Sequence, residues 1–398
     1  MTLVAAWKEE GTPFLLGDFL VSRKRAQCEP EQHACLPTQD DVSVLLTPPS
    51  DFVITDLVQK VYVISDRVAV GWAGSRIGAA TVIRRLRSTL RELKKPFRPL
   101  RKALAPFTAD EIGNLELVGW VLEGTRARCF EWSSAKSSVL AEVESAVAGS
   151  GAESFSHVLN PTHRWRGEQP TVNRVLVMVG KLLGHEVLHR TNLWDRFGGG
   201  IELIHHRDGR FQVVPSVTFA FVRTTEVDGM VDEKRERRVL KIDYQDGAAS
   251  ILCCVSNDDR THRELLFPVS PVDEDTGPAQ YPSHLSLRSS YYCVVADITD
   301  RRGRTIVYPM TVGDECRATL IDYRHYSDGN ESFEIADNCF DLVLDCLNRV
   351  RDDRTQFPPL LYREGKPLLP RVREIQSGRS GISSRLHETQ SAVGRGGR

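Results

Sequence analysis

The sequence lacks the features that mark membrane proteins and disulfide-stapled proteins. No stretch approaches the ~18 apolar residues that a membrane helix needs. The chain has nine cysteines, but no two form a CxxC pair and only Cys253 and Cys254 are adjacent. This spacing favours reduced thiols over a disulfide or zinc framework. Because the N-terminus also lacks the basic-then-apolar pattern of a signal peptide, we expect a cytoplasmic protein.

A large net charge of either sign is also missing. The 398 residues include 52 Lys and Arg against 53 Asp and Glu, which gives a formal net charge of −1. Such a balance provides no general attraction to nucleic acids or anionic membranes, and we expect neither as a partner. Single hydrophobic cores stop growing near ~250–300 residues, so a chain of this length is expected to form two domains.

Hydrophobic periodicity predicts strands first, then helices, then more strands. A hairpin is expected at the start of the chain, followed by a long insertion over about 23–56. The further strands are expected at 60–64, 68–74, 115–122, 125–132, 201–205 and 211–221. Helices are expected at about 77–93, 153–159 and 171–189.

The second half of the chain shows a different pattern. The charged stretch 226–238 is interpreted as a linker or an exposed edge, and short strands are expected between 239 and 323. One helix is expected at 334–350. From about residue 362 the chain is rich in Pro, Gly, Ser and Arg, which predicts a disordered basic tail.

Thr2 directly follows Met1, and its small side chain permits removal of the initiator methionine. The product would carry a free α-amine beside a hydroxyl. An α-amine titrates near ~8, so it can act as a general base at neutral pH and accept the proton of its own hydroxyl. Thr2 is therefore a candidate nucleophile, and the alternative is an ordinary first residue.

Several short motifs follow Thr2 in a fixed order, and each is loose by itself. They are Leu16-Gly17-Asp18, Lys60-Val61, Gly71-Trp72-Ala73-Gly74, Gly149-Ser150-Gly151 and Asp195-Arg-Phe-Gly198-Gly199-Gly200. In this order and spacing the chain resembles the proteasome-type N-terminal-nucleophile hydrolases. The likeness is in particular to the peptidase subunit of the bacterial two-component ATP-dependent protease and to proteasome β subunits. The chain departs from the pattern at Gly198, where the family commonly has a Ser near the nucleophile's amine.

The resemblance implies a role for each matched residue. Thr2 would be the nucleophile, Lys60 would supply a positive charge that favours the ionised hydroxyl, and Asp18 would orient that lysine. Ser150 and Asp195 would complete the hydrogen-bond network around the amine.

Two residues of the third motif would act on the substrate. The Gly74 N–H would stabilise the oxyanion of a tetrahedral intermediate. Trp72 would shape the pocket for the substrate residue before the cleaved bond. The plainer alternatives are that Asp18 and Lys60 form an inter-strand salt bridge and that Trp72 fills the core.

The resemblance also implies a fold and an activity. We expect a four-layer αββα sandwich of the N-terminal-nucleophile hydrolases over 2–225. A mainly β domain of unknown role at 226–361 and an Arg-rich tail at 362–398 would follow. The implied activity is threonine-type amide hydrolysis, without a cofactor, by a peptidase acting on a peptide or protein. Family members assemble as homo-oligomeric rings and often depend on an ATPase unfoldase.

Two other functions stay open at this stage. An amidase of the same fold acting on a small molecule would need no unfoldase. A catalytically silent scaffold would use its basic helix and C-terminal part to bind a partner, and Thr2 would be incidental.

Two further patterns compete for a function. His185-Glu186-Val187-Leu188-His189 matches the HExxH motif of zinc peptidases, with Glu202, His205 or His206 as conceivable third ligands. Since so short a motif arises by chance, we expect no metal. Basic residues crowd 76–102, which we interpret as a solvated helix face.

Overall fold

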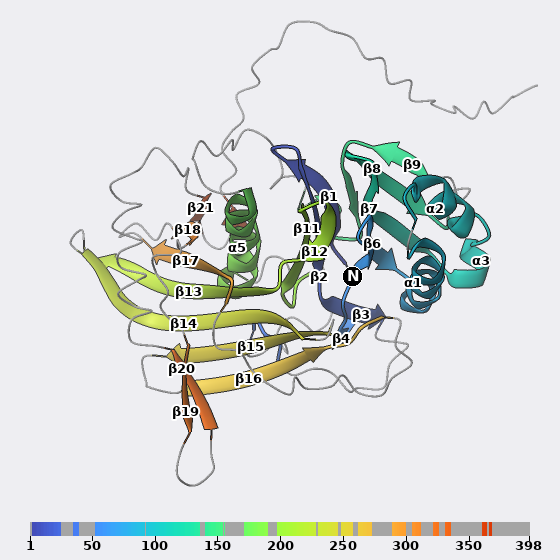
Figure 1. The fold of residues 1–398 in the computed structure, drawn as a ribbon. Coiled ribbons are helices and arrows are strands. Elements are labelled where there is room, and N and C mark those ends of the chain that lie inside the picture. Colours follow the sequence, from blue (N-terminus) through green and yellow to red (C-terminus); the bar gives the residue numbers. More distant parts are fainter. Residues whose placement is uncertain are drawn as a thin grey trace, which may run out of the picture.

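The structure, a computed structural model, describes about two thirds of the chain. The described ranges are 2–24, 35–39, 52–91, 93–135, 140–153, 155, 171–189, 197–227, 230–245, 248–257, 262–272, 289–299, 305–311, 321–325, 331–335, 360–363 and 366–367. Within these ranges the protein is mostly β-sheet, with several antiparallel sheets and four helices (Figure 1).

The first sheet contains the chain start and has the order β10-β1-β2-β11-β12. Its strands are β1 (Val4–Glu9), β2 (Thr12–Asp18), β10 (Ala146–Ala148), β11 (Ile201–Arg207) and β12 (Arg210–Val213). The β1–β2 turn uses Glu10 and Gly11 at positive φ, which confirms the expected hairpin. Every pairing in this sheet is antiparallel.

The second sheet follows the chain order β5-β6-β7-β8-β9. Its strands are β5 (Val61–Ser65), β6 (Val68–Gly74), β7 (Leu115–Glu123), β8 (Arg126–Ser133) and β9 (Ala141–Val143). The two sheets pack through a buried cluster that includes Val4, Leu15, Ala69 and Ile204. Trp120 joins them directly, because its indole N–H donates to the Phe14 carbonyl at 2.8 Å.

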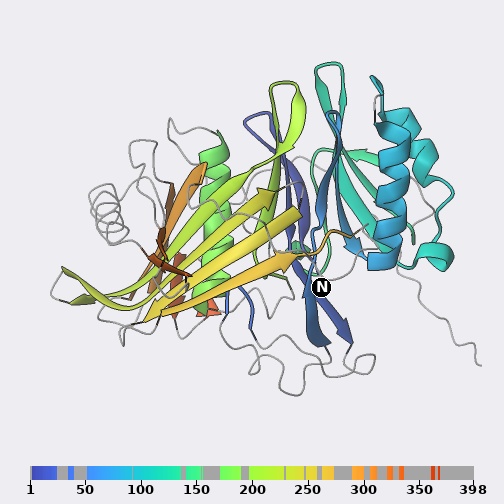
Figure 2. The ribbon, with the colours of Figure 1, turned by 60° about the horizontal axis from the view of Figure 1, so that its bottom comes forward.

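Three helices cover the outer face of this second sheet (Figures 1 and 2). They are α1 (Arg76–Leu90), α2 (Phe97–Leu104) and α3 (Ala109–Ile112). The Ser75 hydroxyl caps α1 by accepting the Gly78 N–H at 3.1 Å. Val82, Leu86 and Leu90 form the buried stripe of α1, so the amphipathic helix expected at 77–93 is confirmed.

The third large sheet has eight strands, in the order β16-β15-β14-β13-β17-β18-β21-β22. These are β13 (Ser216–Val227), β14 (Met230–Gln245), β15 (Ala248–Asn257), β16 (His262–Val269), β17 (Tyr291–Thr299), β18 (Thr305–Thr311), β21 (Leu360–Arg363) and β22 (Lys366–Pro367). Among these pairings, β13 with β17 is parallel and the others are antiparallel. Two small sheets pair β3 (Leu20–Lys24) with β4 (Phe52–Leu57) and β19 (Ile321–His325) with β20 (Glu331–Ile335).

Helix α5 (Thr171–His189) lies between the first sheet and the eight-stranded sheet. It contacts β11 on one side and β13, β17 and β18 on the other, and Figure 2 shows it behind the long strands. One hydrophobic cluster spans all three layers, with Leu3, Leu183 and Ile251 as examples. The first sheet is therefore covered by a helix and a large sheet together.

This arrangement corrects the expected fold class. The four-layer αββα sandwich of 2–225 is wrong, because the protein is mostly β-sheet with several antiparallel sheets rather than two sheets flanked by outer helix layers. The physical reason is the material after residue 215: β13 to β15 are long strands with apolar residues on one face. Those faces bury against the same core as the first sheet, and α5 is enclosed between them.

Several smaller expectations can be compared with the structure. The stretch 226–238, expected as a linker or edge, lies in β13 and β14, which pair within the large sheet, so that linker prediction is wrong. The ends of the insertion 23–56 pair as β3 and β4. Residue 225, the expected domain boundary, falls inside β13, and the division into domains stays a prediction.

Other expectations lie partly outside the described residues. The helix expected at 334–350 begins inside β20, and its remainder is outside them. The tail expected from 362 contains the end of β21 and β22, and the residues after 367 are outside them. Of the helices that the structure describes, none has the length and apolar character needed to cross a membrane.

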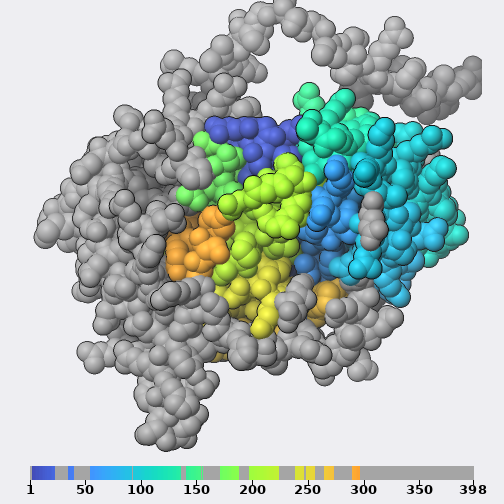
Figure 3. Space-filling model, viewed as in Figure 1, coloured from blue at the N-terminus to red at the C-terminus, as the bar shows by residue number. Residues whose placement is uncertain are grey.

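The surface shows how these parts are distributed. In Figure 3 the chain start (dark blue) and the yellow-green segment that begins near residue 200 lie at the surface. The second sheet and its helices (blue to cyan) are on one side of them, and β17 (orange) is on the other. Chain segments that are distant in sequence thus meet around the first sheet.

The contact between the two five-stranded sheets leaves no room at Gly71. A Cβ there would lie 2.2 Å from Val4 Cγ1, so Gly71→Ala should lower the free energy of unfolding by about 1–3 kcal/mol. Val4→Ala removes the colliding methyl group, and the double variant should lose less than the sum of the two single variants. Urea unfolding at pH 7 measures these differences, and additive losses would contradict the proposed contact.

Candidate active site

Thr2 is held by a glycine turn just before β1. The residue is buried, with 4% of its surface exposed. Its backbone N–H donates to Ser150 Oγ at 3.1 Å, and its carbonyl accepts the Gly151 N–H at 3.1 Å. A Cβ at position 149 would lie 2.2 Å from the Thr2 carbonyl oxygen, and φ there is +92°, so Gly149 is required. The turn therefore holds the backbone of Thr2 against Ser150, and the predicted role of Ser150 beside a free amine stays a prediction.

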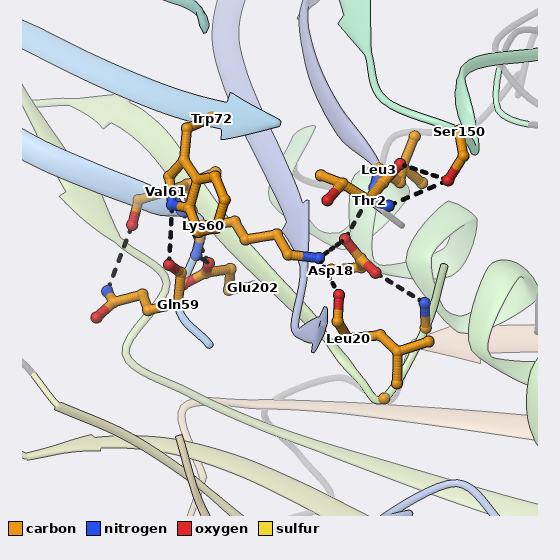
Figure 4. Close-up of polar contacts among 12 residues, drawn as sticks. Thr2, Leu3, Asp18, Leu20, Gln59, Lys60, Val61, Trp72, Ser150 and Glu202 are labelled. Atoms are coloured by element: carbon orange, nitrogen blue, oxygen red, sulfur yellow. Dashed lines mark hydrogen bonds and ion pairs between the residues drawn. The ribbon is translucent and has the colours of Figure 1, made fainter. Parts of the chain in front are cut away.

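Asp18, at the end of β2, joins the Thr2 segment to Lys60. Its Oδ1 accepts the Leu3 N–H at 2.8 Å and the Lys60 Nζ at 2.6 Å. Figure 4 shows Lys60 extending toward Asp18, with Thr2 on the other side of the carboxylate. Lys60 also donates to the Leu20 carbonyl at 2.5 Å. The structure thus brings together Thr2, Asp18 and Lys60.

The ion pair is withdrawn from solvent, and this changes the acidity of the lysine. The side chains of Lys60 and Asp18 are both 0% exposed. Burial lowers the pKa of Lys60 from its usual value, while the adjacent Asp18 charge opposes that shift. The Lys60 ammonium group is therefore held in one position by its hydrogen bonds, and it loses its proton more readily than a solvated lysine does.

Glu202 holds the backbone at Lys60 by accepting its N–H, a role that the sequence did not predict. From β11 its Oε1 accepts the N–H groups of Lys60 at 2.5 Å and Val61 at 2.8 Å. The Tyr244 hydroxyl of β14 donates to Oε2 at 3.2 Å, so the eight-stranded sheet reaches the site through this carboxyl. Burial raises the pKa of Glu202 to about 8. An isolated Glu gives no sequence signal of such a role.

Trp72 of β6 lies beside this network, and Gly74 ends the same strand. Gly74 ends the strand at φ +103°, and a Cβ there would lie 2.3 Å from the Asn114 carbonyl oxygen. Gly74 is exposed, and its role as an oxyanion donor stays a prediction. Trp72 is 1% exposed, and its indole N–H donates to the Gln59 carbonyl at 3.1 Å. The described residues place the indole in the core beside Lys60, and its pocket role stays a prediction.

Glu186 of α5 lies beside Gly198, the position where the chain differs from the motif that it resembles. A Cβ on Gly198 would lie 2.4 Å from Glu186 Oε1 and 2.6 Å from Oε2. Oε1 accepts the Gly199 N–H at 2.6 Å and the Thr38 hydroxyl at 2.5 Å. Thr38 comes from the insertion at 23–56. The HExxH match had suggested a zinc-peptidase role for Glu186, and not a contact with the Gly198–Gly199 segment.

The remaining expected residues are less fully described. Asp195 lies outside the described residues, so its predicted place in the amine network is untested. Gly198 is described, and its N–H donates to Asp18 Oδ2 at 2.9 Å. The backbone of this segment thus contacts Asp18, the residue expected to orient Lys60.

The histidines considered for zinc do not converge within the described part of the chain. His205 stacks on Phe14, and burial lowers its pKa to about 4. His206 packs edge-on against Phe211. The side chain of His189 is outside the described residues, and among those described no group of three His, Cys, Asp or Glu could hold a metal ion.

The basic residues of α1 and α2 form a largely exposed face with local aromatic contacts. The guanidinium of Arg87 lies 5.3 Å from the Tyr62 ring centre, and that of Arg101 lies 5.8 Å from the Phe97 ring centre. Such contacts use the basic side chains within the protein itself.

Comparisons with known proteins add no family to this geometry. No protein-family model matches the chain, and no curated protein matches it. The candidate site therefore rests on its own residues: an N-terminal threonine segment, a buried lysine, the aspartate between them and a serine at the backbone N–H of Thr2.

The buried ion pair should dominate stability near the site. Lys60→Met leaves the Asp18 carboxylate buried without its cation, so we expect a loss of about 3–5 kcal/mol in the free energy of unfolding. Combining Lys60→Met with Asp18→Asn should cost less than the two single changes together.

Chemical denaturation at pH 7 measures the cycle. The matched control is Arg126→Met, which breaks the exposed Arg126–Glu142 pair, and its cost should stay within about 1 kcal/mol. Equal costs for the buried and exposed pairs would contradict the importance of the buried one.

Proposed function

We propose that the protein is a threonine-type amide hydrolase, most simply a peptidase, that uses Thr2 as its nucleophile after Met1 is removed. The observation that supports this best is the shared oxygen of Asp18, which accepts both the Leu3 N–H and the Lys60 ammonium. This oxygen links the backbone next to Thr2 with a buried cation. A hydroxyl attack needs a nearby base and a charge that favours the alkoxide.

The proposed chemistry assigns one task to each group. After Met1 removal the α-amine takes the Thr2 hydroxyl proton while the oxygen attacks the amide carbon. Lys60 stabilises the negative charge on the nucleophile, and the Gly74 N–H stabilises the oxyanion. The amine portion of the substrate leaves with a proton, and water then cleaves the ester on Thr2. Ser150, which now accepts the Thr2 N–H, would hold the amine in place.

The wider setting is part of the same proposal. The thiols of Cys129 and Cys254 are free, which fits a reducing cytoplasm. The resemblance implies a homo-oligomer that can close into a ring, a peptide or protein substrate and an ATPase unfoldase. An amidase for a small molecule would share the same nucleophile.

A specific observation favours the catalytically silent alternative as a second candidate. Thr2 is only 4% exposed, and Trp72 beside Lys60 is 1% exposed. A partner-binding protein has no need for substrate access to Thr2. The experiment must therefore separate a reactive Thr2 from a merely structural one.

We expect the purified protein to lack Met1 and to gain one adduct from a peptide epoxyketone, a reagent that needs both the hydroxyl and the free amine of an N-terminal Thr. Intact-mass spectrometry before and after treatment measures both properties. Thr2→Ser should still react, whereas Thr2→Ala should lose Met1 but form no adduct. Retained Met1, or no adduct on a processed wild-type protein, would favour the silent scaffold.

Peptide amides and small acyl amides, offered in parallel, then distinguish the two hydrolase hypotheses. Turnover of peptide amides that Thr2→Ala abolishes supports the peptidase. Turnover of small amides alone supports the amidase.

A further inference from the structure

Glu186 occupies the space beside a backbone position that has no side chain. It lies on α5, is 0% exposed, and belongs to none of the groups given a catalytic task above. A Cβ on Gly198 would lie within 2.6 Å of its Oε1, Cδ and Oε2 atoms. A side chain at 198 would therefore require the carboxyl group of Glu186 to move from its position.

The Gly198–Gly199 turn is held between two carboxyl groups. The Gly198 N–H donates to Asp18 Oδ2 at 2.9 Å, and the Gly199 N–H donates to Glu186 Oε1 at 2.6 Å. The Gly198 carbonyl accepts the Leu20 N–H at 2.9 Å. The Leu20 carbonyl in turn accepts a hydrogen bond from the Lys60 ammonium. Displacement of the turn would therefore change the hydrogen bonds of both Asp18 and Lys60.

The surroundings of this turn favour a neutral Glu186. Its pKa is raised to about 8, mainly by burial and in smaller part by the nearby Asp18 charge. Hydrogen bonds from Thr38 and Gly199 and the field of Arg238, a buried residue of β14, act in the opposite direction. Within the described residues, Oε2 has no hydrogen-bond partner, which is tolerable for a protonated oxygen and costly for an ionised one.

We infer that Glu186 is a positioning residue: its carboxyl group takes the place of the side chain absent at Gly198 and holds the Gly198–Gly199 turn against Asp18, which keeps Lys60 in register with Thr2. The catalytic consequence rests on the proposed function. The structural consequence does not, because it concerns only the turn and its two carboxyl groups.

The key variants differ in charge and in size. Glu186→Gln keeps the shape and stays neutral at every pH, so it mimics the protonated carboxyl group. Glu186→Ala removes the contact with Gly199. Glu131→Gln, which changes an exposed carboxyl on β8, is the matched control and should alter neither reactivity nor stability.

The first readout is the rate of epoxyketone addition to Thr2 from pH 6 to pH 9.5. At pH 7 the Gln variant should react within about threefold of wild type, and the Ala variant at least about tenfold more slowly. Above pH 8 the wild-type rate should fall as Glu186 ionises next to Asp18, and the Gln variant should lack that part of the decline. An Ala variant that reacts like wild type over the whole range would overturn the inference.

The second readout, melting temperature against pH, needs no activity. The folded protein holds the Glu186 proton up to a pKa of about 8, against 4.5 for an ordinary Glu, so folding binds a proton between these values. This contribution to stability is complete below pH 4.5 and is lost as pH rises to 8. The melting temperature of Glu186→Gln relative to wild type should therefore rise between pH 5 and pH 8.

The two readouts separate the two ideas. Suppose that wild type forms no adduct, but the melting temperature of Glu186→Gln relative to wild type rises between pH 5 and pH 8. The proposed function then fails, and the neutral carboxyl group at the turn is supported. If that gain is absent, the inference fails whatever Thr2 does. Should Glu186→Ala not fold, the Gln variant alone decides both readouts.

Discussion

The rest of the structure depends on one buried ion pair, Lys60 with Asp18. Removing two charges from water costs more than their attraction returns unless further polar groups satisfy them. Here those groups are backbone atoms: the Leu20 carbonyl for Lys60, and the N–H groups of Leu3 and Gly198 for Asp18. The pair therefore determines where the chain start, the end of β2 and the 198–199 turn lie. The first hairpin, the segment at Lys60 and the turn at Gly198 therefore have to meet before both charges are satisfied.

The eight-stranded sheet contributes to this centre from the far side. Tyr244 of β14 donates to Glu202, and Glu202 accepts the backbone N–H of Lys60. Apolar residues of the same sheet, such as Phe219 and Ile251, share one hydrophobic cluster with Leu3 and Phe14. The Tyr244–Glu202 hydrogen bonds hold the backbone of Lys60 in place. The apolar contacts exclude water, so the charge of Lys60 depends on Asp18 and on the Leu20 carbonyl. The C-terminal half of the chain is thus part of what supports the candidate site.

The residues proposed for the site came from the order of short motifs and from the family resemblance that this order implies. The structure places Asp18, Lys60 and Ser150 next to the Thr2 segment, and their catalytic roles stay predictions. Glu186 and Glu202 could not be predicted, because an acidic residue acquires its role from backbone groups about 13 to 142 positions away. The fold class was wrong because the run of charges at 226–238 obscured two long strands, whose partners are chosen by tertiary packing rather than by local preference.

Glycines set how closely the Thr2 segment can be held, and this constraint applies whatever the chain does. Gly149 approaches the Thr2 carbonyl so closely that a Cβ would overlap it, and Gly151 donates its N–H to the same oxygen. Gly198 allows a similarly close approach at Asp18, where its N–H donates to the carboxylate and the missing side chain admits Glu186. The site is built largely by bringing backbone groups against Thr2 and Asp18, and the side chains that join them are the Ser150 hydroxyl and the buried Lys60 ammonium.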